Sequence, residues 1–269
     1  MIGTMPAEAG TKSSYERDGW FQSPQSLDPE VIDRLQAAVA SLSALRRPEV
    51  VHEQGTDTVR AIHGSHLFDE ACARLVRLPA LLELAEEVLG EPVYVYQFKV
   101  NMKQPREGAA WPWHQDYAFW SREDGMPEDR AVNIAVFLDD VHELNGPLVV
   151  IPGSHRLGLV DDDPAAVRAE SGDWHNHVSA DLEHTVPAER AEELARAYGT
   201  ATAVGPAGTL YAFHPTIVHS SSNNLSDDPR ALLLVTYNAV SNAPLRPQRP
   251  DFLVCRDTTP LTAVATNTL

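Results

Sequence analysis

Two residues in the middle of the chain have side chains that bind transition metals. His114 and Asp116 lie two positions apart in the segment WPWHQDY, which runs from Trp111 to Tyr117. If this segment is an extended strand, both side chains leave the same face. One more distant histidine would complete the 2-His-1-carboxylate triad of non-haem iron(II) sites. Without that third residue, the pattern is weak evidence, because many proteins contain it by chance and most such pairs are surface or hydrogen-bonded residues.

Two later histidines compete for the third ligand position. His214 and His219 lie in the apolar segment FHPTIVHSSS. Because they are five positions apart, they would point to opposite faces of one strand, so only one can join the pair. We interpret the other histidines as surface or structural residues: His52, His63, His66, His142, His155, His175, His177 and His184.

An arginine follows these histidines at the start of another apolar run. Arg230 opens the segment RALLLVTYNAV, which is predicted to be a strand. A buried guanidinium costs free energy unless it meets an anion. That anion is either a protein carboxylate or a bound acid, and composition alone does not distinguish the two.

The elements that must position these residues fall into two groups along the chain. Helices are predicted first, one beginning at Asp28-Pro29, with an N-cap residue and then proline at the first helical position, and one ending at Gly90. Apolar stripes support both helices: Val31, Ile32, Leu35, Val39 and Leu42 in the first, and Leu81, Leu82, Ala85, Val88 and Leu89 in the second.

From Val93 the apolar period changes to two, which predicts a strand. We expect one face to meet the core: Tyr94, Tyr96, Phe98, Val100 and Met102. The other face carries four hydrogen-bonding side chains: Gln97, Lys99, Asn101 and Lys103. This polar row is either a solvated sheet surface or the wall of a cavity.

Four further strands are expected in the second half, at 131–138, 148–151, 209–213 and 231–238. Helices followed by short strands predict a mainly β fold, a sandwich or barrel with helices packed on one side. We expect residues 1–14 to be disordered and 15–269 to form a single domain. The stretch 159–204, with a helix near 187–198, interrupts the strands and is predicted to be a lid insertion.

Composition restricts the partners. The formal net charge of −17 at pH 7 repels phosphate backbones and anionic lipids, so we expect neither nucleic acid nor membrane as a partner. No apolar run is long enough to span a bilayer, and the N-terminus lacks the pattern of a secretory signal, which predicts a cytoplasmic protein. Cys72 and Cys255 form no CxxC pair and are expected to stay reduced.

Several ordered motifs between Val93 and Leu261 resemble those of the phytanoyl-CoA dioxygenase superfamily of iron(II)- and 2-oxoglutarate-dependent oxygenases. The motifs are QFKVNMK, WHQDYAFW, NGPLVVIPGSH, and His219 followed by Arg230 eleven positions later. Within the superfamily, they resemble the ectoine hydroxylase branch. The resemblance implies a double-stranded β-helix, the cupin-like jelly roll.

The resemblance also implies roles for individual residues. His114, Asp116 and His219 would bind iron, which leaves His214 a structural role. Arg230 would pair with the distal carboxylate of 2-oxoglutarate. Further residues match positions near the cosubstrate, Asn101 and Ser221, and the wall of the substrate pocket, Gln97, Lys99 and Trp120.

The activity implied is hydroxylation of an unactivated C–H bond by O2, coupled to decarboxylation of 2-oxoglutarate. Asp116 favours hydroxylation, since halogenating relatives carry a small residue at that position. Two departures from the ectoine branch, Lys99 in place of arginine and Leu234 in place of an aromatic residue, indicate a different small-molecule substrate. Ectoine, an amino acid, an organophosphonate or another natural-product intermediate stay open, as does a cupin-like metal-binding protein without activity. A homodimer is also expected.

Overall fold

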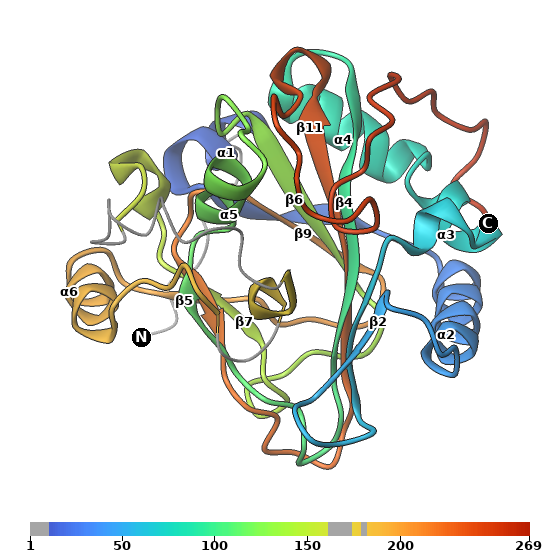
Figure 1. Ribbon diagram of the computed structural model, residues 1–269, viewed down its shortest axis with the longest axis horizontal. Coiled ribbons are helices and arrows are strands. Elements are labelled where there is room, and N and C mark those ends of the chain that lie inside the picture. Colours follow the sequence, from blue (N-terminus) through green and yellow to red (C-terminus); the bar gives the residue numbers. More distant parts are fainter. Residues whose placement is uncertain (1–10, 161–173, 179–181) are drawn as a thin grey trace.

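The computed structural model describes residues 11–160, 174–178 and 182–269, and within them two antiparallel sheets lie face to face (Figure 1). The larger sheet has the strand order β1-β9-β6-β11-β4-β3-β2, and the smaller one β5-β10-β7-β8. The strands are β1 (Trp20–Ser26), β2 (Val50–His52), β3 (Val59–His63), β4 (Val93–Lys103), β5 (Trp111–His114), β6 (Ala131–Phe137), β7 (Leu148–Val150), β8 (Ala201–Thr202), β9 (Thr209–Phe213), β10 (His219–Ser221) and β11 (Arg230–Ala239). The predicted mainly β, jelly-roll fold is confirmed.

Helices cover the outer face of the larger sheet, on the side away from the smaller sheet (Figure 1). They are α2 (Pro29–Ser43), α3 (Glu70–Leu75) and α4 (Pro79–Leu89). The predicted apolar stripe of α2 is buried, and α4 ends where Gly90 adopts a left-handed conformation and its N–H bonds the Glu86 carbonyl. The main hydrophobic core therefore lies between these helices and the sheet. A smaller apolar cluster from β6, β7, β9 and β11 joins the two sheets and borders the cavity that holds the site.

The side chains of β4 do not alternate regularly between the two faces of the sheet along the whole strand. A β-bulge in the pairing with β11 lies where Thr236 pairs with Gln97 and Tyr237 pairs with Val95. The prediction that Tyr94 and Tyr96 share a face with Phe98 is therefore wrong. The two tyrosines pack between the sheets, whereas Val93, Val95, Phe98 and Val100 belong to the core under the helices.

The polar row on β4 faces the inside of the sandwich, and three of its residues, Gln97, Lys99 and Asn101, line a cavity. Lys103 is 1% exposed, and its Nζ donates to the carbonyls of Ala109 and Ser222. Gln97 is also buried, and Lys99 and Asn101 are partly buried inside the sandwich. Of the two alternatives for this face, the solvated surface is excluded.

The remaining described helices are α1 (Thr11–Asp18), α5 (Asp116–Glu123) and α6 (Ala188–Tyr198), with 3-10 turns η1 (Ser65–Leu67), η2 (Ser154–Leu157), η4 (Trp174–His177) and η5 (Val240–Asn242). Residues 11–14, predicted to be disordered, form the first half of α1, and residues 1–10 lie outside the described part. The helix expected near 187–198 is α6. Much of the predicted lid, 161–173 and 179–181, lies outside the described residues.

In the described chain, no helix combines the length and apolar character needed to cross a membrane.

Candidate active site

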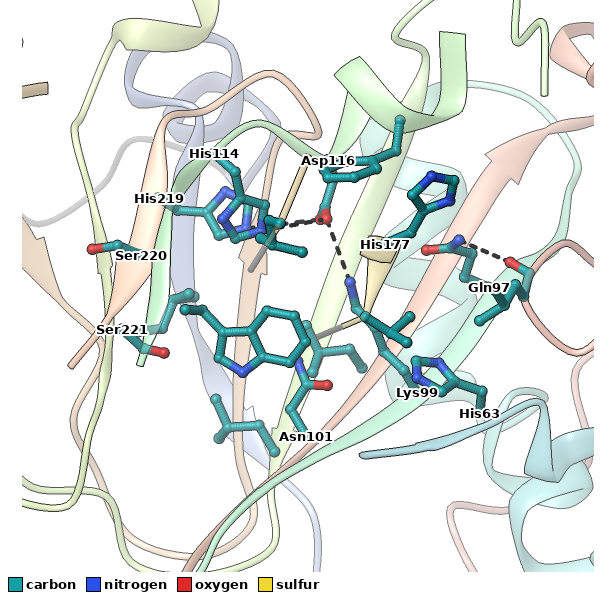
Figure 2. A pocket seen from close by; sticks show the side chains of 18 of the residues that line it. His63, Gln97, Lys99, Asn101, His114, Asp116, His177, His219, Ser220 and Ser221 are labelled. Atoms are coloured by element: carbon teal, nitrogen blue, oxygen red, sulfur yellow. Dashed lines mark hydrogen bonds and ion pairs between the residues drawn. The ribbon is translucent and has the colours of Figure 1, made fainter. Parts of the chain in front are cut away.

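Three side chains from two elements of the smaller sheet and one helix meet between the sheets (Figure 2). His114 ends β5, and His219 begins β10 as its direct antiparallel partner. Asp116 is the first residue of α5. The prediction that His114 and Asp116 share one strand is therefore wrong for Asp116, although the helix start still turns its carboxylate toward both imidazoles.

The distances suit a single ion. His114 Nε2 lies 3.9 Å from Asp116 Oδ1, and His219 Nε2 lies 3.9 Å from Asp116 Oδ2. Two donors that share one ion, each at about 2.1 Å, lie at most about 4.2 Å apart. Two nitrogens and one carboxylate oxygen also form the donor set that selects non-haem iron(II). The residues present therefore fit the metal.

Backbone carbonyls orient both imidazoles. Pro112 O accepts from His114 Nδ1 at 2.7 Å, and Ile217 O accepts from His219 Nδ1 at 3.0 Å, so each Nε2 keeps a lone pair for the metal. Burial, together with the nearby His219, lowers the pKa of His114 to about 3, and burial lowers the pKa of His219. Both histidines are thus neutral, the form that binds metals, at physiological pH.

Asp116 is held as a carboxylate by its neighbours. Asn133 Nδ2 donates to Oδ2 at 2.8 Å, and Lys99 Nζ lies 3.4 Å from Oδ1. Burial alone would raise the pKa of Asp116, but Lys99 and the two histidines lower it to about 2. The carboxylate is therefore ionised before any metal arrives.

His214 lies apart from this centre. Its Nδ1 is 2.6 Å from the Thr216 hydroxyl, and its ring packs beside Tyr15 and His155. The structural role expected for His214 agrees with these contacts.

Arg230 lies buried in the same cavity, at the end of the sandwich where it pairs with Lys103 across β4 and β11. It is 2% exposed, and its Nε and Nη2 donate to the Gly146 carbonyl. Among the described residues, its guanidinium forms no ion pair with a carboxylate, and Asp139 instead accepts from the Ala231 N–H. Burial lowers the pKa of Arg230 to about 9 despite Asp139. A buried guanidinium that bonds a backbone carbonyl but no carboxylate is suited to bind the carboxylate of an acid in the cavity.

The cavity brings together all the residues predicted for the site. It measures about 790 Å³ with its mouth, and the predicted residues that line it are Gln97, Lys99, Asn101, His114, Asp116, Trp120, His219, Ser221 and Arg230. Near Arg230, Asn101 Oδ1 is buried without a hydrogen-bond partner in the described structure. At the other end, Gln97 Nε2 donates to Leu253 O at 2.8 Å, and Trp120 packs edge-on against Tyr96.

The sequence reasoning missed several residues of the cavity wall, among them Arg249 and two histidines. Arg249, in the loop after β11, is buried and donates through Nε to Asp124 Oδ2 at 2.9 Å and through Nη2 to Tyr96 at 3.2 Å. His63, at the end of β3, and His177, at the end of η4, were assigned to the surface or structural group but also line the cavity. None of these three residues stands in a pattern with the triad, so no local signal could have found them.

Comparisons with known proteins agree with this geometry. The family model described as phytanoyl-CoA dioxygenase (PhyH) matches residues 15–232. An L-proline trans-4-hydroxylase of Streptomyces griseoviridis is 58% identical over 94% of each chain, and an ectoine dioxygenase of Nocardia farcinica is 34% identical over 93% of this chain and 85% of the relative.

Among solved structures, EctD from S. alaskensis with 2-oxoglutarate and 5-hydroxyectoine superposes with a TM-score of 0.79 at 29% identity, covering 100% of this chain and 89% of EctD. The same protein has been solved with bound Fe, with a TM-score of 0.81. Sequence, fold and donor set thus agree, and the chain belongs to the phytanoyl-CoA dioxygenase family as an iron(II)- and 2-oxoglutarate-dependent dioxygenase.

Proposed function

We propose that this enzyme hydroxylates free L-proline at C4 and forms the trans product. The proposal is supported by one observation above all. The cavity that holds the iron triad carries a buried guanidinium at each end, Arg230 and Arg249. Arg230 meets no carboxylate among the described residues and suits the 2-oxoglutarate cosubstrate, whereas Arg249 is paired with Asp124 and would offer the carboxylate of an amino-acid substrate the N–H groups that this pair leaves. The 58% identity to an L-proline trans-4-hydroxylase indicates which amino acid.

Iron would be held by His114, Asp116 and His219. When bound, iron and 2-oxoglutarate supply the oxidising chemistry, in which O2 oxidises 2-oxoglutarate to succinate and CO2 and the substrate C–H to C–OH. The chain itself keeps both imidazoles neutral and Asp116 ionised, and it positions the substrate. Because the geometry of that positioning selects the hydrogen, the cavity wall determines where the hydroxyl is placed.

The cosubstrate would occupy the Arg230 end. Arg230 pairs with Lys103, whereas Lys99, which touches the iron ligand Asp116, pairs with Leu234. Four strand residues span about 13 Å, which a five-carbon diacid and an extended arginine side chain together cover. Asn101 and Ser221 line this part of the cavity and would offer additional polar contacts.

The substrate would occupy the Arg249 end. Arg249 contacts Tyr96, seven positions from Lys103 on β4, which is about 23 Å along the strand. The iron ligands therefore lie between the two guanidiniums. Apolar side chains line this end and suit the methylenes of a pyrrolidine ring: Phe119, Trp120, Val178, Leu182 and Leu253.

The test is turnover by the purified enzyme with iron(II), 2-oxoglutarate and O2. We expect L-proline to be converted to a product heavier by one oxygen that co-elutes with authentic trans-4-hydroxy-L-proline, with one succinate formed per product. Ectoine serves as the comparison substrate and is expected to give little product. Faster conversion of ectoine than of proline, or a cis or C3 product, would reject the assignment.

A cytoplasmic location and a homodimer are part of the proposal. The first is tested by fractionation of the source cells and the second by light scattering of the purified enzyme. A membrane-bound fraction or a monomer at micromolar concentration would reject the respective statement.

A further inference from the structure

Within the described part of the chain, the substrate end of the cavity offers no carboxylate that could receive an amine. Among the described residues that line the cavity, the only carboxylate is Asp116, which is assigned to the metal. An amino acid brings a positively charged nitrogen next to its carboxylate. If the proposed function holds, on which this inference rests, the acceptors that the described wall offers to that nitrogen are neutral.

His63 is placed to be such an acceptor. It pairs directly with Lys99 across β3 and β4, and direct partners project from the same face of a sheet, with Cβ atoms about 5 Å apart. Figure 2 shows the His63 ring beside the Lys99 side chain, on the side of the cavity where Gln97 also lies. The residue before it on β3, Ile62, belongs instead to the core under the helices.

The His63 ring is buried, and one of its nitrogens lacks a hydrogen-bond partner among the described residues. The residue is 4% exposed, and its Nε2 has no hydrogen-bond partner in the described structure. Buried polar nitrogens normally have a partner, so an orphan in a cavity wall indicates a bound group. The backbone that carries the ring is fixed on both sides. The His63 N–H donates to Glu49 O at 2.9 Å, and Gly64 has a φ of +64° and packs so closely against Phe252 that a side chain would not fit there.

The surroundings keep the ring neutral. Burial, together with the positive charges of Lys99 and Arg249, lowers the pKa of His63 to about 3. Each cation is itself compensated, since Lys99 contacts Asp116 and Arg249 contacts Asp124. A neutral imidazole carries one nitrogen lone pair, so it accepts from an ammonium but cannot attract a second carboxylate by charge.

We propose that His63 recognises the substrate amine, with an imidazole lone pair accepting a hydrogen bond from the secondary ammonium of L-proline while Arg249 binds the carboxylate. Gln97 provides a second acceptor, since its amide nitrogen is committed to Leu253 O and its oxygen is left for the cavity. His63 is thus a specificity-determining residue, and it separates amino acids from simple carboxylic acids of the same shape.

The experiment compares two ligands that differ at one atom. L-Proline and cyclopentanecarboxylate share a five-membered ring and a carboxylate, but the second has CH2 in place of the ammonium. Their affinities are measured by calorimetry on the enzyme loaded with iron(II) and 2-oxoglutarate, without oxygen. We expect the wild-type enzyme to prefer proline by about 10- to 100-fold, the range for a hydrogen bond to a charged group.

In His63→Leu, and in His63→Phe, which keeps a ring without nitrogens, we expect this preference to fall to about 3-fold or less. The affinity for cyclopentanecarboxylate should change little. His66→Leu is the matched control, because the two ring nitrogens of the partly buried His66 also lack hydrogen-bond partners in the described structure, but its ring stacks on Phe98 outside the cavity lining. It should keep the wild-type preference.

Equal loss of both affinities in the His63 variants would mean a structural role and would overturn the inference, as would an unchanged preference. If neither variant folds, equal affinities of the wild-type enzyme for the two ligands would overturn it as well. A wild-type enzyme that binds no proline at all would instead reject the proposed function.

Discussion

The two ends of the cavity are built from different kinds of structure. The end that carries Arg230 consists of regular strands, with Asn101, Arg230 and Ser221 on β4, β11 and β10. The end that carries Arg249 draws on segments outside the ladders, among them Leu253 and Val178. Strands hold the groups that every reaction cycle needs at fixed spacing, whereas loops can vary the substrate without disturbing them.

The iron centre lies between the ends, and its loss should have the largest effect. His219→Ala leaves one imidazole and one carboxylate, and we expect at least a 1,000-fold loss of kcat/KM together with loss of stoichiometric iron. Iron content is measured after desalting, and His214→Ala serves as a control that should keep iron. Full iron loading of His219→Ala would contradict the ligand assignment.

Arg230→Ala should affect the cosubstrate end alone. Removing the guanidinium costs a charge-assisted bidentate contact, so we expect the KM for 2-oxoglutarate to rise by about 100-fold or more, with little change in the affinity for proline. Arg230→Lys retains the charge and should recover part of the loss. Steady-state kinetics with each reactant varied in turn measures both constants. A larger effect on proline than on 2-oxoglutarate would reverse the two ends.

Arg249→Met should show the opposite pattern, with an increase of about 10- to 100-fold in the KM for proline and an unchanged KM for 2-oxoglutarate. The substitution also leaves Asp124 buried without its partner, which destabilises the fold by about 3–5 kcal/mol. The double variant Arg249→Met/Asp124→Asn removes that penalty and should regain stability without regaining proline affinity. If stability and affinity return together, Arg249 acts only as a structural residue.

The smallest effect concerns His66, which lies at neither end. Burial lowers its pKa to about 4 from 6.5, so between these values the unfolded chain binds more protons than the folded one. Stability must therefore fall as the pH drops below 6.5, and this histidine accounts for about 2 kcal/mol at pH 5 relative to pH 7.5. His66→Leu should reduce the acid loss of unfolding free energy by that amount in urea titrations. An unchanged pH dependence would mean that His66 is protonated in the folded state.

The contrast between the strand-built end and the loop-built end of the cavity also explains which site residues could be predicted from the sequence. Residues on strands follow periodic rules, so the polar row on β4 and the position of Arg230 were accessible from spacing, and the resemblance to a known family assigned their roles. The β-bulge that reverses Tyr94 and Tyr96 was not accessible, because an extra residue in one strand is defined only by its partner strand. Asp116 shows a milder form of the same limit. The strand that was expected to contain it ends at His114, and Asp116 is the first residue of helix α5.

By itself, the amino-acid sequence determined the donor types at the iron centre, the alternating strands and the order of the elements, because these depend on side-chain chemistry and local backbone preference. Only the tertiary structure decided that Arg249, in a loop, and His63, on another strand, face one cavity. They lie 186 positions apart in the sequence, and their meeting depends on how the chain closes across both sheets. No local pattern encodes that closure, because it is set by the packing of the whole sandwich.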